Sequence, residues 1–533
     1  MSLYKTADGI LETHVTWEDV ELELQKRFFT EASFGEKKTA RNISDQKGYM
    51  SKIALVNPDW QNIEPGKALP IQFAVKISSQ LPFMAFSKVL KYTDENGYED
   101  EKLKFMGKIL REAHNREVEA YKLLEKFNHK DVPYTKVYAT KPFLNESDLK
   151  GYIIMDFIPD VFTTSMSEPI PADDLIHTIR GVATFAALGH SLPDDDKKFA
   201  LGAEFLEYYF NTFLEPASIE STLVNLKGAF LSFCEVSRVE NLIEIYRQYI
   251  KIVSRFTRIS ELLGFKMIFN HGDLWQSNML YKRGYDGKLK LKAIIDWQAL
   301  SLLPPGFDMA RLFIGSLSVE DRRQRASELL KVFHETFTNT LGEELFQFQE
   351  IRDSYYLHFP LMSLMVLPGM IPFLENHYLQ KTVMKKMEAI MVDVMEVHDA
   401  EYCDRYIPQL FFGTTKTYVL RNGHATLNIS GDADKYFTPT SSFGRQGIIA
   451  SGDYGTMSAL QDVSVDIGGL SNKSSVFRYY IQSADLVPGV ELEIQRTQDG
   501  NRYTTRYDSS NLPYFNLIIG IMTLTIFGFF VLH

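Results

Sequence analysis

The chain has 533 residues, of which 45% are hydrophobic and 23% are charged, and its formal net charge is -11. A chain of this length exceeds what one compact core can serve, so we expect two or more domains. The acidic balance argues against a nucleic-acid partner, which would need a basic face. Two cysteines, Cys234 and Cys403, cannot form a disulfide framework and lack metal-site spacing, so a reducing compartment is expected.

The N-terminal stretch predicts a helix followed by a hairpin. Apolar residues recur at helical spacing between Val15 and Phe29. Residues 43–56 (ISDQKGYMSKIALV) alternate as two strands would, with a turn at Gly48. An ordinary surface hairpin explains this pattern equally well, because the G-x-G-x-x-G motif of protein kinases is absent. No apolar segment of signal-peptide length precedes this region.

A strand and a long helix follow. Residues 71–77 (IQFAVKI) alternate and are rich in β-branched side chains, which predicts a strand with Lys76 near its end. Residues 101–127 predict a helix. The apolar positions near one side of this helix are Phe105, Ile109, Val118, Tyr121 and Leu124. Residues 135–139 and 151–158 predict two further strands.

The next part of the chain is predicted to be helical. Pro171 and Asp173 open a helix whose apolar side carries Leu175, Ile179, Val182 and Phe185. Residues 205–214 and 355–374 are rich in Tyr, Phe and Met. These two runs could line an apolar substrate pocket, but such stripes more often belong to a core.

Polar residues between Phe269 and Leu312 have the spacing of a phosphate-transfer site. Asn278 follows Asp273 by five residues, and Asp296 ends the apolar run Ala293-Ile294-Ile295. This is the layout of a kinase catalytic loop and metal site. The first carboxylate would orient an attacking hydroxyl and accept its proton. The amide and the second carboxylate would hold magnesium on the ATP phosphates.

The linked motifs HGDLWQSN, IIDWQ and PPGFDMARL resemble the aminoglycoside-phosphotransferase and choline-kinase superfamily. The closest likeness is to the choline-kinase-like group that includes ecdysteroid-kinase-like (CHK kinase-like) and many nematode proteins. The resemblance covers roughly the first 400 residues. It implies an α/β (α+β), protein-kinase-like bilobal fold, with an N-lobe at residues 1–158 and a helical C-lobe at residues 159–412.

The same resemblance implies roles for individual residues. Asp273 would be the catalytic base, and Asn278 and Asp296 would hold magnesium. Lys76 would grip the ATP phosphates. Glu117, which the family's Glu-x-x-x-Tyr pattern selects, would be its partner. Glu112 and Glu119 remain alternatives, because most glutamates on such a helix only solvate one face.

The resemblance also places nucleotide contacts on the backbone. The hairpin would cover the ATP phosphates with N-H groups from Gly48 to Ser51 and with the Ser51 hydroxyl. Backbone groups at Asp156 and Ile158 would bind the adenine edge. The competing interpretation of this segment is a plain strand that runs into a loop.

Two other residues of the motifs are expected to support the catalytic loop, and two positions differ from the residues that protein kinases carry there. His271 would brace the loop by hydrogen bonds. Asp308 would support the loop, or else cap a helix. Gly272 stands where protein kinases carry Arg, and Trp297 replaces the aromatic-Gly ending of D-F-G. No activation-loop switch is therefore predicted.

The predicted function is ATP-dependent phosphorylation of a hydroxyl group on a small molecule. A steroid or glycoside would bind in an apolar cleft, whereas a choline-like substrate would require acidic and aromatic side chains around its quaternary amine. The Met and aromatic content mildly favours the first. The alternative is a catalytically inactive kinase fold that acts as a binding or scaffold protein on a membrane, although a binding-only site would not require Lys76, Asp273, Asn278 and Asp296 together.

The C-terminal part differs in character. Residues 413–510 predict alternating strands of unknown role. Residues 512–532 carry no charge and are long enough to cross a bilayer as a tail anchor. Arg502 and Arg506 would keep the preceding chain, including the catalytic domain, on the cytosolic side. A buried C-terminal helix or a flat hydrophobic strand is the other interpretation.

Overall fold

The computed structural model describes residues 2–44, 50–84, 100–204 and 216–398, together with strands between residues 416 and 508. Three predictions therefore fall outside the described residues. They concern Gly48, the aromatic run at residues 205–214 and the transmembrane helix at residues 512–532.

The chain divides into two compact units. The first contains Met1–Phe205, Val224–Glu235 and Lys266–Asp393. The second contains Leu206–Leu223, Val236–Phe265 and Val394–His533. The predicted domain boundaries after residues 158, 412 and 510 stay predictions.

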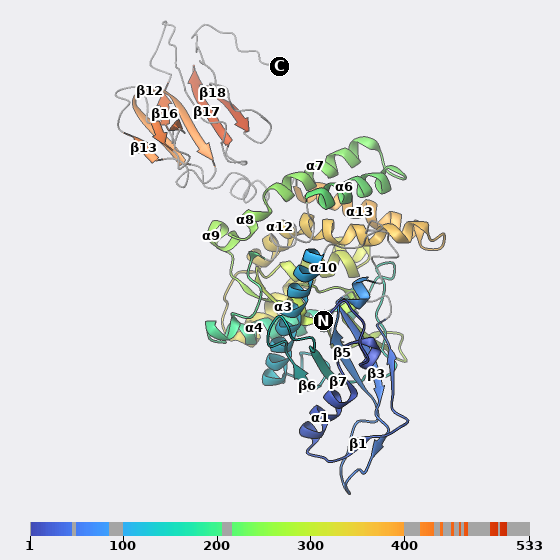
Figure 1. Ribbon diagram of the computed structural model, residues 1–533. Coiled ribbons are helices and arrows are strands. Elements are labelled where there is room, and N and C mark those ends of the chain that lie inside the picture. The colour runs from blue at the N-terminus through green and yellow to red at the C-terminus, as the bar shows by residue number, and fades with distance from the viewer. Residues whose placement is uncertain are drawn as a thin grey trace. The chain divides into compact units, whose positions relative to one another are not determined.

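An antiparallel sheet of five strands forms the N-terminal lobe of the first unit, in the order β2-β3-β5-β7-β6. The strands are β2 (Thr39–Asn42), β3 (Ser51–Asn57), β5 (Phe73–Ser78), β6 (Val137–Lys141) and β7 (Tyr152–Asp156). They lie side by side in the blue and teal part of Figure 1. A separate pair, β1 (Ser33–Phe34) and β4 (Trp60–Gln61), and the short 3-10 helix η1 (Ile10–Glu12) complete the N-terminal elements.

Successive side chains of the central strand β5 alternate between the apolar core of the lobe and a cavity on the other face of the sheet. Phe73, Val75 and Ile77 of β5 belong to one buried apolar cluster. Ala74 and Lys76 point to the other face, where they line a cavity. Because successive side chains of a strand face opposite ways, an apolar core on one face leaves the lysine to the site.

Two helices pack against this lobe. Helix α1 (Trp17–Phe28) begins with a capping box between Thr16 and Asp19, which explains why it starts there. Helix α3 (Asp100–Phe127) contacts β5 and β6. Its buried side includes Leu110, Val118, Tyr121 and Leu124, whereas Phe105 is 43% exposed, so the prediction of Phe105 on the apolar side was wrong.

The rest of the first unit is mainly helical. Its longer helices are α4 (Ala172–His190), α10 (Phe307–Ser316), α11 (Val319–Leu341), α12 (Phe348–Val366) and most of α13 (Gln380–His398). Helix α4 packs on α11, and α10 packs on α12. The 3-10 helices η2 (Asp194–Lys197) and η6 (Leu367–Glu375) also belong to this part. All four predicted core residues of α4 are buried, and a sheet lobe followed by a mainly helical part agrees with the predicted α+β architecture of two lobes.

Short hairpins carry the polar motif between the two lobes. Strand β8 (Ile268–Asn270) pairs with β11 (Ser301–Leu303), and β9 (Met279–Arg283) pairs with β10 (Leu289–Ile294). One-turn 3-10 helices, η4 (Gln276–Asn278) and η5 (Trp297–Ala299), connect them. Asp273, Asn278 and Asp296 therefore all lie in the connections beside these pairs.

One stretch in the described residues, Phe348–Glu375, is long and apolar enough to cross a membrane, with a mean hydropathy of 1.7. It comprises α12 and η6, and 61% of its apolar window is buried inside the protein. Such burial is what the core helix of a globular lobe requires. The Tyr, Phe and Met content of this run thus serves the core of the lobe.

The second unit contains helices α7 (Val236–Lys251), α8 (Val253–Phe256) and α9 (Ile259–Leu263). Helix α6 (Pro216–Leu231) belongs partly to each unit. The strands of the second unit are β12 (Lys416–Ser430), β13 (Thr438–Thr440), β14 (Ile449–Ser451), β15 (Ser458–Ala459), β16 (Val463–Asp466), β17 (Glu491–Gln498) and β18 (Asn501–Asp508). Strands β17 and β18 pair antiparallel, with Gln498 opposite Asn501.

Candidate nucleotide-binding and catalytic site

A cavity of about 330 Å³ lies between the sheet and the polar hairpins. Seven residues that the sequence singles out line it, namely Ser51, Lys76, Glu117, Asp156, Ile158, Asn278 and Asp296. Apolar side chains from both lobes, including Ile53, Ala74, Phe162 and Leu280, cover its walls. Asp273 is not among the lining residues, and Gly48 lies outside the described part of the chain.

Lys76 is held by two carboxylates at the inner end of this cavity. Its Nζ donates to Glu117 Oε1 and Oε2 at 2.7 and 2.6 Å. It also donates to Asp296 Oδ1 at 2.6 Å. The structure thus joins residues that are 220 positions apart in the chain into one ion-pair network. Charge-assisted hydrogen bonds to two carboxylates restrict the rotation of the Lys76 side chain and fix the position of its ammonium group.

Burial and charge act in opposite directions on this network. Burial lowers the pKa of Lys76, but the carboxylates of Asp296 and Glu117 raise that pKa by more, so the amine stays protonated. Burial raises the pKa of Glu117 to about 7, and the Lys76 ammonium opposes that rise. The lysine is therefore a permanent cation at neutral pH.

Helix α3 is fixed to the segment that follows Asp296. Glu117 accepts a hydrogen bond from the backbone N-H of Trp297. Next to it, Arg116 Nη1 donates to the carbonyl oxygen of Gln298 at 2.6 Å. Of the alternative glutamates, Glu119 forms an ion pair with Lys122. The other, Glu112, lies 55% exposed beside Lys108, so Glu117 is the glutamate that contacts Lys76.

The loop after β8 brings Asp273 and Asn278 together. Asn278 Nδ2 donates to the backbone oxygen of Asp273 at 2.8 Å and to its Oδ2 at 3.2 Å. Asn278 Oδ1 accepts no hydrogen bond from the described residues. The donor end of the amide therefore holds the two ends of this loop together.

His271 lies buried between Asp273 and the end of β10. The backbone N-H of Asp273 donates to His271 Nδ1 at 3.3 Å, so Nε2 carries the proton and donates to the Ile295 carbonyl at 3.0 Å. Burial lowers the pKa of His271, which keeps the ring neutral. This arrangement braces the loop, as predicted, and leaves neither ring nitrogen free for proton transfer.

Asp308, at the start of α10, supports the same loop from below. Its carboxylate accepts the backbone N-H groups of His271 at 2.5 Å and Gly272 at 3.0 Å. Burial raises the pKa of Asp308 to about 7. Gly272 has a φ of 81°, and a Cβ there would come within 1.9 Å of the Ala299 carbonyl oxygen. Only glycine fits, which explains the departure from the Arg of protein kinases.

The segment after β7 has one backbone donor already in use. The N-H of Asp156 donates to the Lys136 carbonyl at 2.8 Å, and its carboxylate accepts from the Tyr138 hydroxyl at 2.9 Å. The N-H of Ile158 has no hydrogen bond of this kind among the described residues. A purine edge in the cavity would therefore meet Ile158 as the donor rather than Asp156.

The donor set suits magnesium bound together with a nucleotide. Among the described residues, no three His, Cys, Asp or Glu side chains gather as a metal site. Magnesium commonly takes only one or two protein oxygens and completes its shell with phosphates and water. Asn278 Oδ1 and the partly exposed carboxylate of Asp296 supply two such oxygens at one cavity.

Two contacts of the site were missed by the sequence analysis. Arg311 forms an ion pair with Asp273, and Tyr138 orients Asp156. Arg311 stands in the PPGFDMARL motif, three positions after Asp308, and residues three apart on a helix share a face. That spacing was the available signal. The strand-to-strand contact of Tyr138 has no comparable signature in the sequence.

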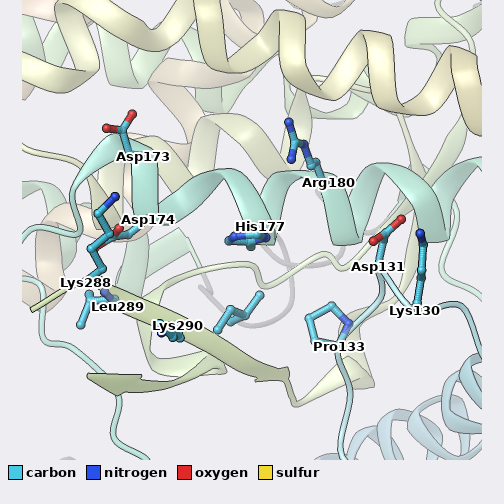
Figure 2. A pocket seen from close by; sticks show the side chains of 11 residues that line it. Lys130, Asp131, Pro133, Asp173, Asp174, His177, Arg180, Lys288, Leu289 and Lys290 are labelled. Carbon is cyan, nitrogen blue, oxygen red and sulfur yellow. Dashed lines mark hydrogen bonds between the residues drawn. The ribbon is translucent and has the colours of Figure 1, made fainter. Parts of the chain in front are cut away.

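A second cavity, of about 490 Å³, shares no lining residue with the first. Figure 2 shows His177 of α4 between the helix and the β-strand that carries Lys290, with Asp173 and Arg180 on the other side of the helix. Charges of both signs surround it. Asp173 pairs with Arg325 at 2.7 Å, and Asp174 accepts the N-H of Leu289 at 2.9 Å.

Comparison with known sequences identifies relatives for most of the chain. Residues 3–402 match the model of the DUF1679 family, whose description reads "Uncharacterized oxidoreductase dhs-27". Residues 391–432 match a domain of unknown function, DUF7591. An uncharacterized kinase-like protein of Caenorhabditis elegans is 33% identical over 104 residues, which are 20% of this chain and 27% of that protein. The match thus spans about a quarter of this relative. These matches confirm the predicted resemblance to nematode kinase-like proteins.

Several solved kinases are similar over most of their length. An ethanolamine kinase of Plasmodium vivax is 13% identical, with 67% of this chain and 82% of that chain covered and a TM-score of 0.34. A choline/ethanolamine kinase family protein of Mesorhizobium loti is 10% identical, with 74% and 98% covered and a TM-score of 0.35. A spectinomycin phosphotransferase is 12% identical, with 73% and 100% covered and a TM-score of 0.36. At scores of this size, the assignment of the fold depends on the strand order and contacts described above.

Proposed function

The chain belongs to the DUF1679 family, and we propose that it is an ATP-dependent phosphotransferase that acts on a hydroxyl group of a small molecule. One observation carries the proposal. Lys76, Asn278 and Asp296 line the same cavity, and Asp273 is hydrogen-bonded to Asn278 at its edge. A phosphate-binding cation, two metal-binding oxygens and a carboxylate base are the parts that phosphoryl transfer requires.

Each part of the cavity has a role in binding Mg·ATP. The adenine lies between Ala74 and Leu280, with the Ile158 N-H and the Asp156 carbonyl at its edge. Lys76 contacts the α- and β-phosphates, where its protonated amine offsets their charge. Asn278 Oδ1 and Asp296 would hold magnesium, which would supply positive charge to offset that of the phosphates. Ser51 covers the phosphates from β3.

Asp273 orients the acceptor hydroxyl and takes its proton. The hydroxyl oxygen forms a bond to the γ-phosphorus while the bond from that phosphorus to the β-γ bridging oxygen breaks. The proton passes to Asp273, and ADP leaves with the electron pair of the broken bond. His271 takes no proton, because both of its ring nitrogens are engaged.

The charge around Asp273 favours an acceptor without a cation. Arg311 pairs with Asp273 in a partly buried contact, so the base carries little uncompensated negative charge. A quaternary or protonated amine beside it would meet the guanidinium. A steroid or glycoside hydroxyl therefore fits this site better than a choline-like alcohol.

The family description mentions an oxidoreductase, and the described residues offer no dinucleotide site of the usual kind. The sequence contains no G-x-G motif. The five-stranded sheet is antiparallel, whereas the dinucleotide-binding fold needs parallel strands and a glycine-rich turn before a helix. The proposal therefore follows the cavity rather than the description.

Nucleotide binding by the purified full chain tests the cavity. We expect the dissociation constant of ATP to be at least about tenfold lower with magnesium than with EDTA, and Asp296→Asn to remove most of this difference. Lys290→Met, a change at the second cavity, is the control and should bind as wild type does. Binding that is equally tight with and without magnesium would contradict the proposed metal site.

A further inference from the structure

Arg311 of α10 contacts the proposed base directly. Its Nη2 donates to Asp273 Oδ1, and the two side chains are 12% and 29% exposed. An arginine-carboxylate contact that is shielded from water is stronger than one on the surface and fixes the geometry of both groups.

The position of Arg311 is determined by the same helix that holds the loop. One turn earlier on α10, Asp308 accepts the N-H groups of His271 and Gly272. The guanidinium carbon of Arg311 lies 5.8 Å from the centre of the Trp275 ring, which packs against it. Helix α10 therefore contacts this loop twice: Asp308 binds its backbone N-H groups, and Arg311 binds the side chain of the proposed base, Asp273.

The two oxygens of Asp273 have different partners. Oδ1 accepts from Arg311, and Oδ2 accepts from Asn278 Nδ2 at 3.2 Å. A carboxylate offers about four lone-pair directions, so two remain for a substrate hydroxyl. With both oxygens held, rotation of the carboxylate is restricted, and the remaining directions point to a fixed place.

We propose that Arg311 is a positioning residue that sets the orientation of Asp273 for proton transfer. This inference rests on the proposed phosphotransferase function. Arg311 acts through Asp273, and it is not among the residues that line the nucleotide cavity. Its removal should therefore lower kcat and leave the KM for ATP unchanged.

The expected size of the effect follows from the geometry of proton transfer. Misplacing a catalytic group by about 1 Å lowers a rate by roughly 100-fold. We expect Arg311→Met to reduce kcat for Mg·ATP hydrolysis by about 30- to 100-fold, with KM within about twofold of wild type. Arg311→Lys keeps a cation beside Asp273 and should recover about tenfold of that loss.

The experiment measures kcat and KM for Mg·ATP hydrolysis by the full chain, as wild type, Arg311→Met and Arg311→Lys. Arg325→Met, which removes a partly exposed arginine from its ion pair with Asp173, is the matched control and should leave both constants unchanged. The rise in melting temperature that Mg·ATP causes is recorded for every variant, to show whether the cavity is intact.

The outcomes separate the two proposals. If wild type turns over ATP and Arg311→Met is equally active, or changes only KM, the role of Arg311 is wrong. If Arg311→Met and Arg311→Lys both lose the Mg·ATP-induced rise in melting temperature, Arg311 supports the fold, and its positioning role is also wrong. If wild type binds Mg·ATP but neither releases phosphate nor transfers it to any compound in a metabolite extract, the phosphotransferase proposal itself fails.

Discussion

At the scale of single residues, the site depends on charges that are buried together. Lys76 is 9% exposed and Glu117 only 1% exposed, so neither ion is solvated by water. Removing one partner from such a buried pair leaves an uncompensated charge, which commonly destabilises a protein by about 3–5 kcal/mol. The network of Lys76, Glu117 and Asp296 is thus expected to contribute to the stability of the fold, whatever it binds.

Lys76→Met tests this requirement through pH. Without the ammonium, the pKa of Glu117, already about 7 through burial, rises further. The folded chain then keeps a proton that the unfolded chain releases near its ordinary pKa, so stability falls as pH rises from that value through the folded pKa. We expect urea denaturation to show a larger loss at pH 8 than at pH 5.5.

The double variant Lys76→Met/Glu117→Gln is the control for that experiment. It lacks the buried carboxylate, so most of the extra loss at pH 8 should disappear. Equal losses for the single variant at both pH values would show that Glu117 does not depend on Lys76.

Gly272→Ala tests the close approach of the catalytic loop to the segment after Asp296. The added Cβ would clash with the Ala299 carbonyl oxygen, so we expect a loss of several kcal/mol, beyond the roughly 1 kcal/mol that a positive φ alone costs. Gly287→Ala is the matched control, since Gly287 has a φ of 78° with nothing within 4 Å. Chemical denaturation that shows equal losses for both variants would contradict the contact.

At the scale of elements, α10 and α13 meet at a buried lysine. Lys386 Nζ donates to the carbonyl of Gly315, in the last turn of α10, at 2.5 Å and to the carbonyl of Met166 at 3.1 Å. Burial, with Arg322 as a smaller cause, lowers the pKa of Lys386 to about 7. A neutral amine can satisfy both carbonyls with its two N-H groups.

This lysine predicts a rise of stability with pH. Between about pH 7 and the ordinary lysine pKa, the unfolded chain binds a proton that the folded chain does not, so stability increases with pH. We expect the difference between wild type and Lys386→Met, measured by denaturation, to grow by a few kcal/mol in favour of wild type from pH 7 to 10. Lys385→Met, which changes an exposed neighbour, should show no such growth. A constant difference would mean that Lys386 stays charged.

Patterns local in the sequence predicted the helices α1, α3 and α4 and the strands β3, β5, β6 and β7, and contacts between distant elements explain where such patterns failed. The apolar side of α4 follows a single helical period, so its buried residues were predictable. Phe105 fits a similar period but lies on the exposed side of α3, although Leu103 and Leu110 before and after it are buried. Motif spacing selected Asp296 and the family resemblance selected Lys76, and the two side chains form an ion pair in the folded chain. Arg311 was missed because its spacing from Asp308 is a weak signal by itself, and its salt bridge to Asp273, 38 residues away in the sequence, adds no further pattern.

At the scale of the whole molecule, the family model matches residues 3–402, which include the sheet lobe, most of the helices and the candidate site. Attachment to a membrane by residues 512–532 stays a prediction, which cell fractionation can test. The full chain should remain in the membrane pellet after a carbonate wash, because an uncharged segment of this length is stable in hydrocarbon. A chain that lacks these residues should move to the supernatant. Release of both forms would refute the anchor.

Transfer of labelled phosphate is the most direct measurement of the central claim. The full chain is incubated with magnesium, γ-³²P-labelled ATP and a fractionated metabolite extract, and label in each fraction is compared between wild type and Asp273→Asn. We expect wild type to label at least one small-molecule fraction and the variant to do so at least about 100-fold more slowly. If wild type binds Mg·ATP but labels no fraction and releases no phosphate, the protein is a binding module with a kinase fold, and the account is wrong.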